Sequence, residues 1–492
     1  MDFIETPKAA AAPAPSIATG VQTTDFASIK NGTLIAEGAG AKSFSNRVLI
    51  GMLVGAPFMA TRKVGGGLYV FLVFALLFFF PILIGYWTFA SNFSPRINEK
   101  CKLPNRGIDH YIKFSTPELR AKYPKTIPME VFHELYFDGK VDFNGDPLEV
   151  MEERYDWAQF SFTRGLFKFF LTGMIPEVIL HSRSQDEEQV RDHYDRGDDF
   201  YSWFLGPRMI YTSGIIQDPT REETLEELQD NKLRIVAEKV GVQKGDRCLD
   251  LGCGWGTLAR YFSKVYGADV TGITLGRHQT EYGNKNLRQD GTPESQSRIL
   301  CMDYRDTPVP PEKYKRITCL EMSEHVGVRN FGSFLSQVYD MLEDDGVFFM
   351  QYAGLRKSWQ YEDLIWGLFM NKYIFPGADA STPLGWTLDK LEATGFEITA
   401  VDTIGIHYCG TIWRWYRNWM GNREKVVAKY GEKWFRIWAF FLSYSTIIAR
   451  QGSSTAFQIT MRKNLNSVHR AEYIPKQGGL QWPLLNRNNK WL

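Results

Sequence analysis

The stretch Lys244-Gly-Asp-Arg-Cys-Leu-Asp-Leu-Gly-Cys-Gly-Trp-Gly-Thr257 decides the fold. An apolar run from Cys248 to Leu251 meets three glycines spaced two apart, Gly252, Gly254 and Gly256. This pattern predicts a buried strand that turns sharply into a helix. Because glycine tolerates positive φ and has no Cβ, a nucleotide-like molecule can lie against such a loop. Taken alone, the glycines would also suit a strand-to-helix turn in another kind of α/β protein.

The segments after the loop extend the prediction to a sheet. The loop differs from the dinucleotide fingerprint G-x-G-x-x-G, which an acidic residue follows at the end of the next strand. Here the next predicted strand, 268–274, leads to Gln279 with no carboxylate at its tip. A third predicted strand, 298–302, runs into Asp303-Tyr-Arg-Asp306. Strand ends about 25 to 30 residues apart are typical of successive βα units, so we expect a doubly wound sheet.

Three strings carry a family resemblance. LDLGCGWGT (249–257), ITLGRHQ (273–279) and DYRD (303–306) resemble segments of the cyclopropane-fatty-acyl synthase group of S-adenosylmethionine-dependent methyltransferases. With two apolar segments ahead of it, the chain looks most like the fungal sphingolipid C-9 methyltransferases of the cyclopropane synthase superfamily. The resemblance covers residues 190–465. It implies an α/β fold with a Rossmann-like class I methyltransferase domain, preceded by N-terminal transmembrane helices, and S-adenosylmethionine as cofactor.

The resemblance also implies a set of cofactor contacts. Some of these contacts lie in the segment 193–214, which precedes the glycine loop. Without the resemblance, His193 and the acidic residues after it would equally suit a solvent-exposed helix start. The implied contacts are Tyr211, Thr212, Leu249, Asp250, Leu251, Gly252, Cys253, Gly254, Trp255, Gly256, Thr257, Thr274, Leu275, Gly276, Arg277, His278, Gln279, Tyr304 and Arg305.

In the resembled family the methyl acceptor is an alkene carbon, and this chemistry implies the remaining requirements. The protein must align donor and acceptor and exclude water. The acceptor becomes a carbocation, which needs negative or π-electron surroundings and a base. In the resembled family, the glutamate of E-H-x-G helps hold a bicarbonate that serves as the base, and Glu324 matches that glutamate. A family tyrosine matches Tyr408. A helix-cap role for Glu324 stays open.

The chain departs from the bacterial members at two positions. Gln351 stands in place of a histidine, and Ser445 in place of a cysteine. Both can hydrogen-bond an anion, but neither matches histidine as a base near neutral pH. We hypothesise that this altered anion site changes where the cation loses its proton, so that a methyl-branched alkene forms instead of a cyclopropane ring.

Composition narrows the class of protein. The net charge of +1 argues against an extended nucleic-acid surface, and the 14% of aromatic residues favours apolar ligands or a membrane surface. The six cysteines are scattered without metal-ligand spacing, so we expect no metal site, no disulfides and a reducing, cytosol-facing compartment.

The N-terminal part predicts a membrane anchor. Residues 1–46 are expected to be a disordered tail, and 47–92 a membrane region with apolar segments 48–60 and 64–90. The second is long enough to cross a bilayer of about 30 Å. We favour a hairpin of two spans with both ends cytosolic; a single span with a re-entrant first segment stays open.

Three further regions are predicted with less detail. Residues 93–189 are a linker and interfacial region, in which the phenylalanine-rich part 160–171 suits an interfacial helix or a buried one equally well. The insertion 411–448 combines aromatic with basic residues and is predicted to line a lipid channel; core packing and single-stranded nucleic acid are the alternatives. Residues 456–461 should pair antiparallel with 396–401, and 466–492 form a C-terminal tail.

The resemblance implies the reaction and its place. The substrate would be the sphingoid base of ceramide, unsaturated between carbons 8 and 9, methylated at carbon 9 for glucosylceramide synthesis. The membrane would be the endoplasmic reticulum, with the catalytic domain facing the cytosol; membrane lipids are expected partners and nucleic acid is not. One rival is a cyclopropane synthase acting on phospholipid acyl chains, and another is a non-catalytic lipid-binding protein. Headgroup, chain length and oligomeric state are not predicted.

Overall fold

A computed structural model describes residues 17–18, 21–22, 24–30, 38–94, 103–174, 197–378 and 380–470. Most of the predicted tails, Cys101 and the start of the segment 193–214 with His193 therefore lie outside the described residues.

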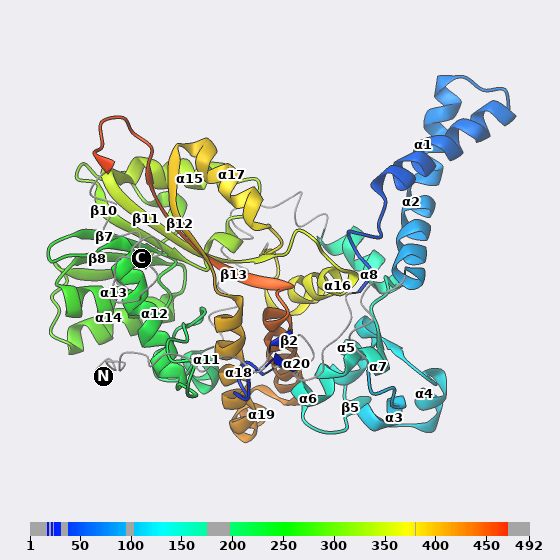
Figure 1. The fold of residues 1–492 in the computed structure, drawn as a ribbon, viewed down its shortest axis with the longest axis horizontal. Helices are drawn as coiled ribbons and strands as arrows, with labels where there is room; N and C mark the ends of the chain where they lie inside the picture. The colour runs from blue at the N-terminus through cyan, green and yellow to red at the C-terminus, as the bar shows by residue number, and fades with distance from the viewer. Residues whose placement is uncertain are drawn as a thin grey trace.

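A seven-stranded sheet forms the centre of the catalytic part (Figure 1), in the order β12-β13-β11-β10-β7-β8-β9. Its strands are β7 (Arg247–Leu251), β8 (Asp269–Thr274), β9 (Ser297–Cys301), β10 (Tyr314–Leu320), β11 (Leu342–Leu355), β12 (Phe396–Thr403) and β13 (Ser454–Lys463). Strands β7 to β11 pair in parallel, and β13 is antiparallel to both of its neighbours. The predicted antiparallel pairing of 396–401 with 456–461 is confirmed, since Val401 lies opposite Ile459.

Helices cover both faces of this sheet, as a doubly wound fold requires. The covering helices are α12 (Leu225–Val240), α13 (Thr257–Tyr261), α14 (Arg277–Gln289), α15 (Phe331–Met341) and α17 (Leu384–Thr394). Side chains alternate along β7: Cys248 belongs to the core formed with α12 and α13, and Leu249 to the core formed with α15 and α17. The buried run that suggested a strand is therefore buried on both faces, and the predicted α/β class is confirmed.

A second, helical layer packs beside the sheet. It consists of α11 (Asp198–Leu205), α16 (Tyr361–Phe369), α18 (Gly405–Gly421), α19 (Arg423–Tyr430) and α20 (Glu432–Arg450). The aromatic residues of the 411–448 insertion lie here, and Trp415, Trp419 and Trp438 are among the largest fully buried side chains. They share one apolar core with residues of 103–174. Core packing therefore accounts for most of the aromatic residues in this insertion.

Residues 103–174 fold as a set of short elements against that layer. These are α3 (Ile108–Tyr111), β3 (Ile112–Phe114), α4 (Pro117–Lys122), β4 (Ile127–Pro128), α5 (Met129–Phe137), β5 (Val141–Phe143), α6 (Pro147–Glu152), α7 (Arg154–Trp157), β6 (Ala158–Gln159) and α8 (Arg164–Phe169), with one wider turn at Phe170–Met174. Arg154 forms a fully buried ion pair with Glu362 of α16, with Nε 2.5 Å from Oε1. The region that sequence motifs left unassigned is thus tied into the same body as the sheet.

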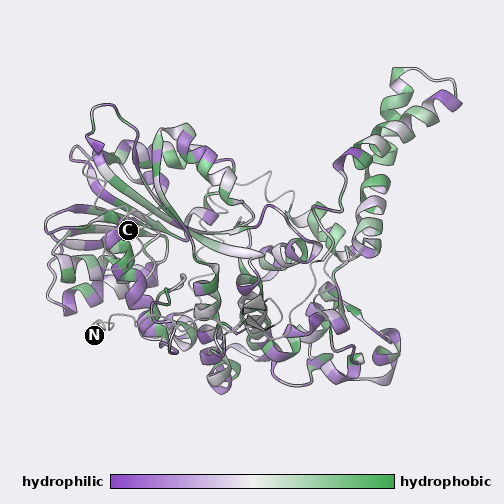
Figure 2. Ribbon diagram, viewed as in Figure 1, coloured by the Kyte–Doolittle hydropathy of each residue, from purple (hydrophilic) through white to green (hydrophobic). Residues whose placement is uncertain are grey.

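The N-terminal segments form a helical hairpin that projects from this body, α1 (Asn46–Lys63) and α2 (Leu68–Phe93) (Figure 1). Figure 2 shows that α2 is apolar along most of its length. Among the described residues, α2 is the one helix long and apolar enough to cross a membrane. The hairpin is as predicted, but support for a span extends to one of its two helices, because α1 is less apolar and carries Arg47, Arg62 and Lys63.

Candidate active site

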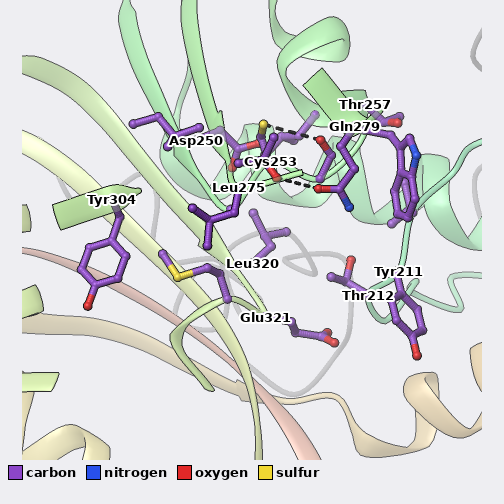
Figure 3. A pocket seen from close by; sticks show the side chains of 18 of the residues that line it. Tyr211, Thr212, Asp250, Cys253, Thr257, Leu275, Gln279, Tyr304, Leu320 and Glu321 are labelled. Carbon is purple, nitrogen blue, oxygen red and sulfur yellow. Dashed lines mark hydrogen bonds between the residues drawn. The ribbon is translucent and has the colours of Figure 1, made fainter. Parts of the chain in front are cut away.

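A cavity of about 160 Å³ opens at the carboxyl ends of β7, β8 and β10. Doubly wound sheets bind ligands at this edge. Figure 3 shows side chains from the glycine loop, from α14 and from the segment with Tyr211 converging on it.

The glycine loop is fixed by its backbone. The N–H groups of Gly252 and Cys253 both donate to the carbonyl of Ile273, each over 2.9 Å. Gly254 has φ +53°, and a Cβ there would meet no atom within 4 Å, so this backbone is open to a ligand. At Gly256, with φ +77°, a Cβ would lie 2.0 Å from Ile299 Cδ1. Gly254 thus leaves room for a ligand, whereas Gly256 permits close packing of α13.

The polar lining of the cavity is charged and largely buried. Asp250 accepts a hydrogen bond from Thr318 over 2.7 Å, and burial raises the pKa of its carboxyl to about 6. Lys232 donates to the hydroxyl of Thr212 over 2.6 Å, and burial lowers the pKa of its amine to about 8. Both groups are held away from bulk water beside the glycine loop.

Most of the predicted cofactor contacts lie in this lining. They are Tyr211, Thr212, Asp250, Gly252, Cys253, Gly254, Trp255, Thr257, Thr274, Leu275, Gln279, Tyr304 and Arg305. The others lie behind it or outside it: Leu249 and Leu251 are buried in β7, Gly256 and Gly276 precede helices, and Arg277 and His278 are exposed on α14.

Several lining residues were not among the predicted contacts. They include Met209, Ile210, Lys232, Leu233, Leu258, Ile273, Met302, Asp303, Leu320, Glu321, Met322 and His325. Lys232 lies within a helix, where nothing in its neighbours marks it. Glu321 directly follows β10, and the rule that ligands bind at strand ends could have identified it.

Glu321 is the centre of a partly buried hydrogen-bond network. Its Oε1 accepts from the Ser213 N–H over 3.0 Å and from Gln351 Nε2 over 2.6 Å. Its Oε2 accepts from the Tyr408 hydroxyl over 2.8 Å. Burial raises the pKa of Glu321, while these three donors and Lys232 oppose that rise. Two of the predicted catalytic residues, Gln351 and Tyr408, are thus brought together around a carboxylate that was not predicted.

The other two predicted catalytic residues lie apart from this network. Glu324, in the turn Ser323–His325, accepts from the Ala353 N–H over 2.6 Å and lines a separate small pocket. Burial and the nearby Glu321 raise the pKa of its carboxyl to about 8. Ser445 is buried on α20, and its hydroxyl has no hydrogen-bond partner among the described residues.

Aromatic rings extend from the network into the helical layer. The Tyr211 ring lies 5.4 Å from that of Trp415 and 6.0 Å from that of Phe375, measured between centroids. His325 lies 6.1 Å from Phe375, and Tyr408 lies 6.0 Å from Trp415. Of these rings, those of Tyr211 and His325 line the cavity, and the Tyr211 ring gives this side a π surface that suits both an apolar chain and a cation.

Solved structures match the fold. The cyclopropane synthase MmaA2 from Mycobacterium tuberculosis aligns with a TM-score of 0.52 at 27% identity, over 56% of this chain and 98% of that one. The mycolic acid cyclopropane synthase CmaA1, complexed with SAH and CTAB, also aligns with a TM-score of 0.52, at 25% identity over 56% of this chain and 98% of its own. The catalytic part thus has the class I S-adenosylmethionine-dependent methyltransferase fold.

Sequence comparisons identify the family. Residues 181–459 match the model of mycolic acid cyclopropane synthetase. The sphingolipid C9-methyltransferase 2 of Gibberella zeae is 64% identical over 491 residues, which cover 99% of this chain and 94% of the relative. The sphingolipid C9-methyltransferase of Komagataella phaffii is 64% identical over 96% of this chain and 98% of its own length. The chain therefore belongs to the mycolic acid cyclopropane synthetase family and, within it, to the sphingolipid C9-methyltransferases.

Proposed function

We propose that the chain transfers a methyl group from S-adenosylmethionine to carbon 9 of the 8–9 double bond in the sphingoid base of ceramide. The product would be 9-methyl-4,8-sphingadienine, destined for glucosylceramides. The observation that carries the proposal is the near-full-length identity to sphingolipid C9-methyltransferases, which includes the N-terminal hairpin as well as the catalytic part.

The cavity suits a cationic nucleotide-like cofactor. When bound, S-adenosylmethionine supplies an electrophilic methyl group on a sulfonium. Asp250 and Glu321 give this side of the cavity two carboxylates, of which that of Asp250 is buried, and Gly254 leaves its backbone open toward the cavity. The Tyr211 ring borders the same space. These groups would bind the cofactor and exclude water from the reacting atoms.

The aromatic border supports an apolar acceptor. An alkene within a long chain must lie beside the cofactor, and Tyr211, Phe375 and Trp415 form a continuous set of rings leading away from Glu321. Rings in this position would stabilise the positive charge that develops on the acceptor carbon. The 411–448 insertion would thus act on this space through Trp415, which packs against Tyr211, while most of its aromatic residues stabilise the core.

The hairpin would anchor the enzyme in the membrane. The Ser45 N–H donates to the Tyr86 hydroxyl over 3.1 Å and joins the two helices, and the Ala41 N–H donates to the Trp359 carbonyl over 2.8 Å, which places the base of the hairpin at the catalytic body. Trp87 stacks on Trp359 and packs against Phe162, and such an aromatic group suits the headgroup region. Helix α1, with 18 residues, reaches about 27 Å, close to the thickness of a bilayer core. Because S-adenosylmethionine is made in the cytosol, the body would face the cytosol from the endoplasmic reticulum.

Product analysis tests the proposal. Membranes containing the protein receive methyl-labelled S-adenosylmethionine, a diunsaturated ceramide and an unsaturated phospholipid together, and fragmentation mass spectrometry identifies the labelled lipid. The products are then hydrogenated to count double bonds, because branching and ring closure add the same mass. Label in ceramide with both double bonds retained is the expected result. Label in phospholipid with one double bond lost would identify a cyclopropane synthase, and cofactor binding without any labelled lipid would indicate a non-catalytic protein.

A further inference from the structure

The expected bicarbonate site already contains a carboxylate of the chain. The groups predicted to hold the anion include Gln351 and Tyr408, and both donate to Glu321. The Ala353 N–H, at the end of the same buried segment, is taken by Glu324. A bicarbonate would find these donors engaged and would lie between two acidic side chains. The residues present therefore do not fit a bound bicarbonate.

We propose that Glu321 is the catalytic base of this enzyme, its side-chain carboxylate taking the proton that a separate anion would otherwise take. The proposal rests on the proposed methyl transfer to an alkene. Glu321 lines the same cavity as Asp250, Gly254 and Tyr211, so its carboxylate faces the space in which donor and acceptor must meet.

The surrounding network holds Glu321 as an acceptor. Gln458 Nε2 donates to Gln351 Oε1 over 2.8 Å, and Lys239 donates to Gln458 Oε1 over 2.6 Å. These two hydrogen bonds set the orientation of the Gln351 amide, so that its NH₂ group points at Glu321. An amide does not titrate, so Gln351 cannot compete for the proton. The replacement of histidine by glutamine thus leaves Glu321 as the proton acceptor of the network.

The backbone at Glu321 is held in an unfavourable conformation. Its φ is +54°, in the left-handed region, which is unfavourable for a residue with a side chain. The N–H of Glu321 donates to the carbonyl of Gln351 over 2.6 Å, which fixes the turn at the end of β10. Such strain is maintained where a side chain must be placed for function.

With Glu321 as the proton acceptor, the electrons and the proton of the methyl transfer are all accounted for. The π electrons of the acceptor form the new bond from carbon 9 to the methyl group, and the methyl–sulfur electron pair stays on sulfur. Carbon 8 is left as a cation. Loss of the hydrogen on carbon 9 returns its electron pair to the carbon 8–carbon 9 bond, and the proton goes to the Glu321 carboxylate. The double bond is restored with a methyl branch, and no co-reactant is needed.

Two substitutions separate this role from a structural one. Glu321→Gln keeps the size of the side chain and retains an oxygen that can accept from Gln351. We expect turnover to fall at least about 100-fold, the usual loss for a positioned base, while affinity for S-adenosylhomocysteine, which lacks the sulfonium charge, is retained. Glu321→Gly also relieves the positive φ and leaves a space beside Ser213, Gln351 and Tyr408. We expect added formate or bicarbonate to restore turnover in this variant in a saturable way.

The wild-type enzyme supplies the decisive comparison. It should turn over at the same rate in carbonate-free buffer and with added bicarbonate, and it should bind no ¹³C-bicarbonate by NMR. Wild-type turnover that requires bicarbonate, or a Glu321→Gln variant with more than about a tenth of wild-type turnover, would overturn the proposal. So would a Glu321→Gly variant that binds S-adenosylhomocysteine but is not rescued. If the wild type labels no ceramide, the proposed function fails instead.

Discussion

The hydroxyl of Tyr408 donates a hydrogen bond to Glu321 Oε2 over 2.8 Å, and this contact joins helix α18 to the carboxyl end of β10. Tyr408 is thereby part of two environments, since its ring also lies 6.0 Å from that of Trp415. The Tyr408 side chain therefore connects the aromatic residues of the helical layer to the hydrogen-bond network of Glu321. Substitutions in either should change the environment of Glu321.

Replacement of Tyr408 by phenylalanine should shift the pH dependence of turnover. In the wild type, the hydrogen bond from Tyr408 lowers the pKa of Glu321. Removal of this bond therefore raises the pKa of Glu321. Because the base must be ionised, the rising limb of turnover against pH should move to higher pH, and turnover below it should fall about 10-fold or more. Tyr416→Phe is the matched control. Tyr416 lies on the same helix as Tyr408, but its hydroxyl donates to Asp146 and not to Glu321. Identical pH profiles for Tyr408→Phe and the control would contradict the prediction.

The amide chain behind Glu321 should show graded effects. Gln351→Leu removes a direct donor to Glu321 and should lower turnover about 10-fold or more, because hydrogen bonds to charged groups contribute about 1.5–3 kcal/mol. Gln458→Leu removes only the residue that orients Gln351, so turnover should fall less in this variant than in Gln351→Leu. Turnover and S-adenosylhomocysteine affinity are measured for both variants. A larger loss in Gln458→Leu than in Gln351→Leu would show that the direct contact does not matter.

The sequence allowed the sheet and much of the cavity to be predicted, because these depend on local pattern. The buried run before Gly252 and the spacing of the following strands set the βα units. Gln351 and Tyr408 were found through motif positions. Glu321 was missed because its role depends on a positive φ and on donors from three distant segments, and the only local signal was its position directly after β10.

The helical layer shows the same limit. Arg154 and Glu362 are 208 residues apart and form one buried ion pair, so the folding of 103–174 onto the catalytic body could not be read from periodicity. The aromatic insertion was interpreted as a lipid channel because its composition is the same for a lipid surface and for a core. Burial separates the two, and Trp419 and Trp438 are fully buried.

The Arg154–Glu362 pair gives a stability prediction. Both side chains are 1% exposed, and Tyr444 also donates to Glu362. Arg154→Met leaves the Glu362 charge buried without its partner and should lower the free energy of unfolding by about 3–5 kcal/mol. Arg154→Met combined with Glu362→Gln should recover part of that loss. Thermal unfolding in detergent measures both, and a double variant less stable than the single one would refute this account.

Helix α2 gives a prediction about membrane association. Leu76 and Leu77 are 78% and 61% exposed in the structure, which suits contact with lipid. Leu76→Arg with Leu77→Arg should weaken insertion, because each arginine at a helix centre costs about 2.5–3.5 kcal/mol. Flotation of membranes on a density gradient measures the bound fraction. Val309→Arg places the same charge on an exposed apolar residue of the catalytic part and should leave flotation unchanged. Equal flotation of the α2 variant and this control would rule out α2 as the anchor.

Glu324 should make stability depend on pH between about 4.5 and 8. Burial and the neighbouring Glu321 raise the pKa of Glu324 from 4.5 to about 8, so the folded chain keeps a proton that the unfolded chain releases. The stabilisation is fully present below the unfolded pKa and is lost as pH rises through the folded pKa, at up to about 1.4 kcal/mol per pH unit. Glu324→Gln cannot titrate, so its melting temperature should fall less than that of the wild type between pH 5 and pH 8. Glu312→Gln, at a side chain that is 86% exposed, should follow the wild type. If the melting temperatures of Glu324→Gln and the wild type changed equally between pH 5 and pH 8, Glu324 would be ionised in the folded enzyme.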